Sequence, residues 1–405
     1  MNAPVIDRDL WTASGEALLD DAIALRRAIH AEPELGLDCP KTTAKIKRAL
    51  DGLPLELREG PSTTGLVAVL RGPQNGRTIL LRGDMDALPL QEDTGLDFAS
   101  QTHGAMHACG HDTHVAMLAG AARVLCGQRE RLNGTVVFMF QPGEEGWHGA
   151  KYMLEDGLLD NPRPDAAFAL HISPNMPAGV FAGRAGPLLA SADEFEIRIT
   201  GKGGHGAMPH ETLDPVPIAA ETVLAMQTLV SRKTPPNESA VVTVGKIESG
   251  TTDNVIPETA TLLGTIRTLD ERVRTLLHEG VERVATHVAL AHGARAETEI
   301  TPGFPVTVCD GRIVDLAERT AIALFGEHGW RTMPSPVMGA EDFAYVLQQM
   351  PGAMAFLGAV PEGGDYHSCC GLHSNRMVLD ERVMARGVAM HCAMAEAFLN
   401  GEAVV

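Results

Sequence analysis

The sequence predicts an α/β fold in which a helix-flanked mixed sheet carries an inserted ferredoxin-like unit. Three observations predict this fold. The outer segments alternate short apolar runs with helical patterns. The middle segment has the order β-α-β-β-α-β. The length of 405 residues suits two domains with separate cores. We therefore predict one domain from residues 1–189 and 305–405, and an inserted domain from residues 190–304.

The outer segments supply the elements of the larger domain. Apolar, β-prone runs predict strands at residues 65–70, 78–82, 135–140 and 353–358, and in the AAFALHI run that reaches His171. Helical spacing predicts helices at residues 115–126, 150–159, 313–328, 341–350 and 381–399. Polar residues follow several of these strands directly, which places them at the carboxyl edge of the sheet.

The middle segment supplies the elements of the inserted domain. Strands are expected at residues 195–201, 240–248, 259–269 and 295–301, and helices at residues 216–231 and 271–291. This order is the split βαβ pattern.

Composition and charge exclude several classes of partner. The formal net charge of −19 argues against nucleic acid and against an anionic membrane, because both require a basic surface. No run approaches the roughly 20 apolar residues of a membrane span. The seven cysteines are odd in number and fit no disulfide framework, and the N-terminal residues lack the pattern of a signal peptide. We expect a soluble, cytoplasmic protein with reduced thiols.

Two motifs near the start of the chain carry candidate metal ligands. Asp84 and Asp86 follow a predicted strand at i and i+2, so both project from one side of an extended chain. The segment HACGHDTH, from His107 to His114, then places three imidazoles, a thiol and a carboxylate before an apolar helix. These are ligands of borderline divalent metals, and Gly110 lets the backbone bend to direct them inward.

Three further groups stand at later positions. Glu144 and Glu145 follow the TVVFMF strand, and such a pair can divide metal binding from proton transfer. His171 ends a buried strand, and His373 lies in an LHS segment. Each group alone has an ordinary explanation, as a solvated strand end, a helix start or a buried histidine. Together they favour one site, because strand ends of an α/β sheet converge at one crevice.

Eight motifs occur in order along nearly the whole chain: GDMDALP, HACGHDTHVAM, QPGEEG, ALHISP, GKGGHGAMPH, NVIPETATLLGTIRT, MGAEDF and LHS. In this order they resemble the M20 metallopeptidase family, and more closely its D branch of amidohydrolases. That branch includes hippurate hydrolases, auxin-conjugate hydrolases and other N-acyl-amino-acid hydrolases. The resemblance implies a catalytic domain around the metal site and an inserted lid and dimerisation domain.

The resemblance also implies roles for ten residues. Two divalent metals would be bound by Cys109, His111, Glu145, His171 and His373, with Cys109 bridging them. Glu144 would be the general base, and Asp86 would orient a ligand histidine. On the inserted domain, His205 would stabilise the oxyanion, and Asn254 and Arg267 would hold the substrate carboxylate. No role follows for Asp84 or His114.

The implied activity is hydrolysis of an N-acyl amino acid to a carboxylic acid and a free amino acid. Zn²⁺ or Mn²⁺ is the expected metal, and Co²⁺ or Ni²⁺ is compatible with the ligands. A homodimer or higher homo-oligomer through the inserted domain is expected by analogy. The alternatives are a dipeptidase or aminopeptidase of the same fold, and a non-catalytic binding module, which the presence of both glutamates disfavours.

Two segments depart from the family pattern. After LHS, this chain reads Asn375-Arg376-Met377 where a proline and an aromatic residue are frequent, which predicts an altered pocket rim. The pair Cys369-Cys370 is also unexpected, and we interpret it as structural or redox-sensitive.

Overall fold

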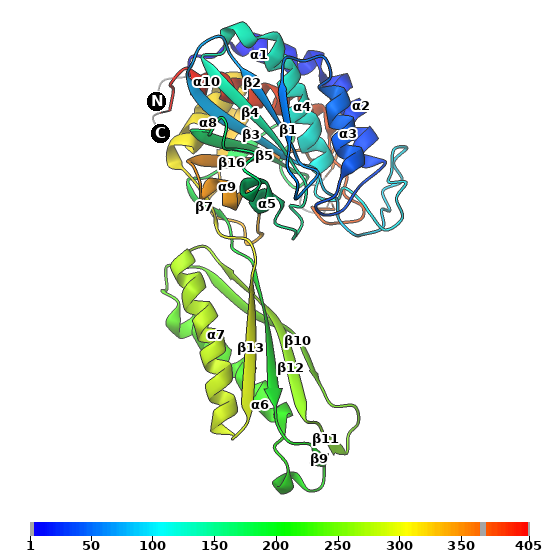
Figure 1. Cartoon of the computed structure of the whole chain (residues 1–405), viewed down its shortest axis with the longest axis vertical. Coiled ribbons are helices and arrows are strands. Elements are labelled where there is room, and N and C mark those ends of the chain that lie inside the picture. Colours follow the sequence, from blue (N-terminus) through cyan, green and yellow to red (C-terminus); the bar gives the residue numbers. More distant parts are fainter. Residues whose placement is uncertain (1–3, 365–369, 404–405) are drawn as a thin grey trace. The chain divides into compact units, whose positions relative to one another are not determined.

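The computed structural model describes residues 4–364 and 370–403 and divides into two compact units. The first unit contains residues 1–188, 308–335 and 345–405, and the second contains residues 189–307 and 336–344. Figure 1 shows the helices and strands of each. The segment 336–344 is the main departure from the predicted domain limits, because it groups with the second unit although it follows that unit by about 30 residues.

The first unit is built on an eight-stranded mixed sheet in the order β1-β2-β4-β3-β5-β16-β6-β15. Its strands are β1 (Glu56–Glu59), β2 (Leu66–Arg71), β3 (Arg77–Asp84), β4 (Gly134–Gln141), β5 (Ala166–Ser173), β6 (Phe181–Gly183), β15 (Trp330–Thr332) and β16 (Gly352–Gly358). The four central strands, β4, β3, β5 and β16, are parallel. They therefore end at the same edge, where β3, β4 and β5 deliver the polar motifs.

Helices enclose this sheet. They are α1 (Arg8–Ala17), α2 (Leu19–His30), α3 (Pro40–Ala49), α4 (His111–Gly127), α5 (Gly149–Glu155), α8 (Gly311–Phe325), α9 (Ala344–Leu347) and α10 (Met384–Leu399). Helices α4 and α10 pack on β3 and on each other (Figure 1). Central strands β3, β4 and β5 are buried along almost their whole length, which is typical of parallel strands covered on both faces. Burial on both faces explains why these strands appear as continuous apolar runs in the sequence.

The predicted α/β fold is confirmed, with differences at the ends of elements. Helix α5 ends at Glu155, because Gly157 adopts a left-handed φ of 68° that terminates the helix. The helix predicted at residues 341–350 shrinks to α9, and the Glu341 carboxylate accepts the Phe343 N–H just before it. Helices α1 to α3 are additions to the prediction.

The second unit is a four-stranded antiparallel sheet in the order β10-β12-β8-β13, covered by two helices. Its elements are β8 (Asp193–Thr200), α6 (Pro215–Thr228), β10 (Ala240–Ser249), β12 (Thr259–Thr268), α7 (Glu271–Ala291) and β13 (Arg295–Pro302). Along β8 the side chains alternate strictly between buried and exposed, so one face of the sheet meets the helices. This is the ferredoxin-like arrangement that the order of elements predicts.

Among the described residues, no helix has the length and apolar character to cross a lipid bilayer.

A buried carboxylate anchors the start of β8 in the second unit. Asp193 accepts hydrogen bonds from the Arg274 guanidinium, from His278 Nε2 at 2.8 Å and from the Gly303 N–H at 3.0 Å. Burial opposes ionisation of this carboxyl, but these donors lower the pKa of Asp193 to about 2. The ion cluster thus joins β8, α7 and the end of β13.

Asp193→Asn should lower the free energy of unfolding at pH 7 by about 1.5 to 3 kcal/mol, because a buried charge-assisted bond is weakened. Since the folded-state pKa is depressed, the stabilisation is present above the usual pKa of about 3.9 and is lost as the pH falls through about 2. The difference between variant and wild type in urea unfolding should therefore shrink between pH 4 and pH 2. Glu194→Gln, at the exposed neighbouring position, should change stability little. Equal effects of the two substitutions would contradict this account.

Candidate metal centre

The five predicted metal ligands all lie in the first unit. Cys109 precedes α4 and His111 begins it, Glu145 follows β4, His171 lies on β5, and His373 lies in the loop between β16 and α10. The parallel strands β3, β4 and β5 bring these segments to one edge of the sheet (Figure 1). The chain thus gathers residues that are up to 264 positions apart in the sequence.

A sharp turn at Gly110 places Cys109 and His111 side by side. Gly110 has a left-handed φ of 80° and precedes the first residue of α4. A Cβ atom at this position would lie 2.4 Å from Ile172 Cγ2 on β5, so only glycine fits both the backbone conformation and the space. The predicted role of Gly110 as the bend in this motif agrees with this geometry.

The ligand atoms form two groups of three that share one residue. The Cys109 thiol, His111 and His171 form one group, and Cys109, Glu145 and His373 form the other, with ligand atoms within 4.8 Å of one another in each. Cys109 Sγ lies 3.4 Å from His171 Nε2. His373 Nε2 lies 3.3 Å from Glu145 Oε1. Cys109 is therefore the residue that these two groups share, and His111 Nε2 also lies 4.0 Å from Glu145 Oε1.

Hydrogen bonds fix which nitrogen of each buried histidine faces the centre. His111 Nδ1 donates to the Asp86 carbonyl oxygen at 2.9 Å, and His171 Nδ1 donates to the Ile172 carbonyl oxygen at 2.7 Å. Each Nδ1 donates to a carbonyl, so Nε2 is the atom of each ring that faces the centre. Burial opposes the charge on His111, but Asp84 and Cys109 raise its pKa well above the usual range, and a bound cation would displace the proton from its Nε2. Burial also lowers the pKa of His171, which keeps this ring neutral and able to bind a cation.

The residues fit a divalent metal on chemical grounds. His111 Nε2 is buried and has no hydrogen-bond partner among the residues that the structure describes, and such an orphaned polar atom is costly unless a cation or a hydrogen-bond partner satisfies it. A buried thiol, two imidazoles and a carboxylate are ligands that suit borderline metals. Burial raises the pKa of the Cys109 thiol, and a neighbouring divalent cation would reverse that shift.

His373 and Glu145 differ from the buried ligands in their exposure and strain. The His373 side chain is 56% exposed, and its backbone has a φ of 67°, which is uncommon outside glycine. Its N–H donates to the Ala108 carbonyl oxygen at 2.8 Å, which ties this loop to the Cys109 turn. Burial acts to raise the pKa of Glu145, but His373 and His111 lower it below its usual range. This side of the centre is the one open to solvent.

Asp86 holds the glutamate pair in place. Its carboxylate accepts the backbone N–H groups of Glu144 at 2.9 Å and of Glu145 at 3.0 Å. The sequence predicted that this carboxylate would orient a ligand histidine. It lies 3.6 Å from His111 Nδ1, but the hydrogen bond to that ring comes from the Asp86 carbonyl oxygen. Asp86 thus contacts both the β4 turn and the start of α4.

Glu144 is buried and lies beside the ligand cluster. Its side chain is 8% exposed, and its Oε2 is 3.8 Å from His111 Nε2. The left-handed Gly143, with a φ of 73°, turns the chain after β4 so that Glu144 and Glu145 both follow the strand end. Glu144 therefore lies beside the candidate ligands His111 and Glu145.

The three residues predicted on the inserted domain lie in the second unit. His205 is on the short strand β9 (Gly204–His205), which pairs with β11 (Val255–Ile256), so His205 and Asn254 lie close together. Arg267 stands near the other end of β12, and the eight positions between Thr259 and Arg267 span about 27 Å in an extended strand. The second unit thus brings His205 and Asn254 together, but not Arg267.

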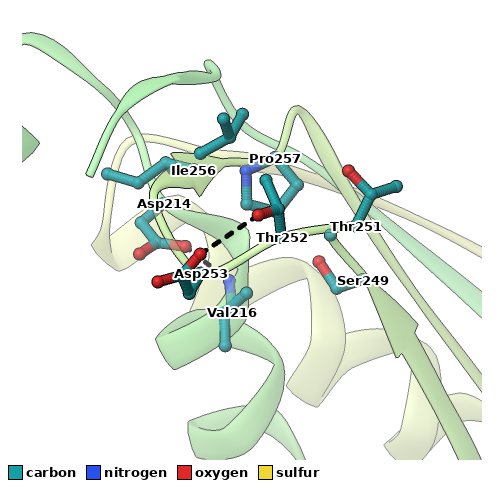
Figure 2. Close-up of a pocket in the computed structure, with 10 residues that line it drawn as sticks. Asp214, Val216, Ser249, Thr251, Thr252, Asp253, Ile256 and Pro257 are labelled. Atoms are coloured by element: carbon teal, nitrogen blue, oxygen red, sulfur yellow. Dashed lines mark hydrogen bonds between the residues drawn. The ribbon is translucent and has the colours of Figure 1, made fainter.

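A surface pocket of about 380 Å³ adjoins Asn254 in the second unit (Figure 2). Its polar lining includes Asp214, Asp253 and the hydroxyl groups of Ser249, Thr251 and Thr252. Asp214 caps α6 by accepting the Val216 N–H. The lining holds no histidine, cysteine or glutamate, so this pocket carries none of the candidate catalytic groups.

The departures after the LHS segment also have a structural outcome. Met377 is buried with Met106 and Ala108 beneath the Cys109 turn, so it belongs to the core and not to a pocket rim. Arg376 forms an exposed ion pair with Asp93. Cys369 lies outside the described residues.

Sequence reasoning missed a buried ionic cluster beside the centre. Arg26 Nε and His30 Nδ1, both on α2, contact the Asp112 carboxylate at 2.9 and 2.8 Å. Burial opposes the charge on His30, yet Asp112 and Glu92 raise its pKa to about 9. The cluster fastens α2 to the first turn of α4. Only Asp112 gave a signal, as part of the HACGHDTH motif.

Comparisons with known proteins agree with this geometry. Residues 80–397 match peptidase family M20/M25/M40. Thermostable carboxypeptidase 1 of Saccharolobus solfataricus is 39% identical over 94% of this chain and 96% of the relative. IAA-amino acid hydrolase ILR1-like 2 of Arabidopsis thaliana is 40% identical over 96% and 88% of the two chains. N-acetylcysteine deacetylase of Bacillus subtilis is 40% identical over 83% and 87%.

A solved structure is similar over nearly the whole chain. The YXEP protein of Bacillus subtilis, described as a dinuclear metal binding peptidase from the M20 family, superposes with a TM-score of 0.81. It is 35% identical and covers 95% of this chain and 99% of its own.

Gly110→Ala should destabilise the first unit and lower its metal content, because the new Cβ would meet Ile172 and displace His111. We expect a loss of about 1 to 2 kcal/mol from the left-handed backbone and about 1 to 3 kcal/mol more from the clash. Gly104→Ala is the matched control, since Gly104 has a φ of 74° and open space around its Cβ direction. Thermal unfolding and metal analysis of both variants test this, and equal losses would contradict a steric role for Gly110.

Asp86→Asn should weaken metal binding about 10- to 100-fold, because an amide can accept only one of the two glutamate N–H groups. Competition with a chromophoric chelator measures the affinity. The exposed Asp93→Asn, also in the first unit, should leave the affinity unchanged. Unaltered metal binding in the Asp86 variant would show that Glu144 and Glu145 do not need the hydrogen bonds from their N–H groups to the Asp86 carboxylate.

Proposed function

The chain belongs to peptidase family M20/M25/M40, and from that premise we propose that it is a metal-dependent amidohydrolase of N-acyl amino acids. The products are a carboxylic acid and a free amino acid. Two relatives support this choice by name, one as an IAA-amino acid hydrolase and one as an N-acetylcysteine deacetylase. A third is named a carboxypeptidase. All three names describe cleavage of an amide bond at an amino acid.

The observation that carries the proposal is the position of Cys109 in both ligand groups. A thiolate can bridge two cations, so the two groups can hold two divalent metals through one sulfur. We assign Cys109, His111 and His171 to one metal, and Cys109, Glu145 and His373 to the other. The Nε2 atoms of His111 and His171 already face this centre, which supports binding without rearrangement of the rings.

Glu144 is the general base in this proposal. The divalent metals, when bound, supply Lewis acidity that polarises the amide carbonyl and makes a water easier to deprotonate. Glu144 takes the proton of the attacking water and later gives it to the leaving nitrogen. The Asp86 carboxylate fixes the backbone of Glu144 and so keeps the base in position. The burial of Glu144 limits competition from bulk solvent.

The second unit supplies the substrate contacts. We assign oxyanion stabilisation to His205, and binding of the substrate carboxylate to Asn254 and Arg267. His205 accepts the Ala207 N–H through Nδ1 at 3.0 Å, so its proton lies on Nε2, which is free to donate to an oxyanion. Arg267 lies on β12, apart from the β9–β11 pair that carries or adjoins the other two residues.

The remaining parts of the proposal concern the metal, the assembly and the compartment. Zn²⁺ or Mn²⁺ suits a centre of thiolate, imidazole and carboxylate, and Co²⁺ or Ni²⁺ can replace them. Strand β10 is an edge of its sheet and exposes Val241 and Ile247, which supports a homodimer through the second unit. Cys39, Cys109, Cys126, Cys309 and Cys392 are free thiols, which supports a reducing cytoplasm.

Glu144→Gln should lower kcat about 10²- to 10⁴-fold and leave metal content unchanged, because it removes the base and no ligand. Glu145→Gln is the matched partner variant and should lose metal. Release of amino acids from N-acetyl, N-benzoyl and long-chain N-acyl amino acids measures kcat, after the metal-free chain is reloaded separately with Zn²⁺ or Mn²⁺. Full activity of the Glu144 variant would contradict its role as the base.

The same assay separates the two activities that this fold supports. An amidohydrolase should prefer the N-acylated panel, whereas a dipeptidase or aminopeptidase should need a free amine. Turnover of free-amine dipeptides alone would overturn the proposed substrate class in favour of a peptidase.

A further inference from the structure

Asp84 and His114 form a buried pair that the proposed chemistry does not use. Asp84 is the last residue of β3, and His114 lies on the first turn of α4. Their side chains are 0% and 1% exposed, and His114 Nδ1 lies 2.5 Å from Asp84 Oδ1. The other oxygen of Asp84 accepts from Arg82 at 2.6 Å. Burial opposes the charge on Asp84, but Arg82 and the neighbouring histidines hold its pKa well below its usual range.

The hydrogen bonds of His114 determine its tautomer. The Ile172 backbone N–H donates to His114 Nε2 at 2.7 Å, so Nε2 must carry a lone pair. The proton is therefore on Nδ1, where it is donated to Asp84. Both nitrogens are thus occupied, which argues against metal binding by His114, although it lies near His111 and Asp84.

The backbone of Ile172 connects this pair to a proposed metal ligand. Its N–H is held by His114, and its carbonyl oxygen accepts from Nδ1 of His171. The ring centroids of His114 and His171 are 4.7 Å apart. The orientation of the His171 ring, and with it the direction of Nε2, therefore depends on a backbone segment that His114 holds.

The sheet explains why this segment needs support from a side chain. The ladder between β3 and β5 ends at the pair Arg82 and Ala169, three residues before Ile172. Beyond that point β5 keeps β16 as its neighbour on one side only. A buried N–H without a ladder partner is costly, and His114 Nε2 replaces the missing acceptor.

We propose that Asp84 and His114 are positioning residues that orient His171 for metal binding, through the backbone N–H and carbonyl groups of Ile172. Asp84 selects the tautomer of His114, His114 accepts the Ile172 N–H, and the carbonyl oxygen of the same residue, Ile172, orients His171. The inference rests on the proposed function, since it takes His171 as a ligand. It predicts that loss of the pair weakens the binding of one metal ion, the one held by Cys109, His111 and His171. The binding of the other ion should be unchanged.

The test is cobalt binding by four variants of the full chain. Titration of metal-free protein with Co²⁺ gives the affinity for each ion, and the visible spectrum reports ligand geometry around the sulfur and nitrogen donors. His114→Leu removes both hydrogen bonds, and His114→Gln keeps one acceptor and one donor. Asp84→Asn lets an amide donate to Nδ1, which would move the proton to Nε2, opposite the Ile172 N–H. His391→Leu is the control, because His391 is also a buried histidine, on α10.

We expect His114→Leu and Asp84→Asn to weaken one of the two cobalt ions about 10- to 100-fold and to change its spectrum. His114→Gln should restore most of the affinity, and His391→Leu should match wild type. A merely structural role would lower the melting temperature of the metal-free protein and leave the spectrum of the loaded protein unchanged.

Wild-type affinities and spectra in His114→Leu would overturn the inference. If that variant does not fold, Asp84→Asn decides in the same way. Suppose that the wild-type chain binds two cobalt ions and hydrolyses N-acyl amino acids, and that the variants behave like it. That result would overturn only the positioning role of Asp84 and His114. A wild-type chain that binds no cobalt removes the proposed function as well.

Discussion

The parallel alignment of β3, β4 and β5 is the constraint on which the rest of the site depends. Parallel strands end at one edge of the sheet. Strand pairing alone therefore brings together the residues at these strand ends, and these residues need no direct contact with one another to be placed there. The start of α4 reaches the same edge through the turn at Gly110. Four separate segments thereby present a thiol, imidazoles and carboxylates to one small volume.

The end of the sheet creates a second problem, which the same polar residues solve. Where the ladders stop, backbone N–H groups lose their acceptors although they remain buried. Asp86 accepts those of Glu144 and Glu145, and His114 accepts that of Ile172. Each of these bonds satisfies the backbone and positions a proposed catalytic or ligand residue. Stability and chemistry therefore share the same hydrogen bonds, and few of them can be changed without cost to both.

The sequence contained most of the fold, because apolar runs and helical spacing record burial directly. It also contained the candidate ligands, since the motifs that carry them are local. It could not reveal the long-range partners. Nothing near Arg26 or His30 indicates that α2 is tied to Asp112. Nor could the motif show that Asp86 uses its carboxylate for the glutamate turn and its carbonyl for His111. Such roles depend on which backbone N–H groups have no hydrogen-bond acceptor on a neighbouring strand. That is a property of the assembled sheet.

The central claim is that one thiol belongs to both metal positions, and the number of ions bound by two single variants tests it most directly. Native mass spectrometry of the chain loaded with Zn²⁺ counts the ions. Because Cys109 stands in both ligand groups and His171 in one, Cys109→Ala should reduce occupancy of both positions, whereas His171→Ala should keep one ion. A Cys109→Ala chain that retains one ion at wild-type affinity would contradict the shared thiol and require two independent sites.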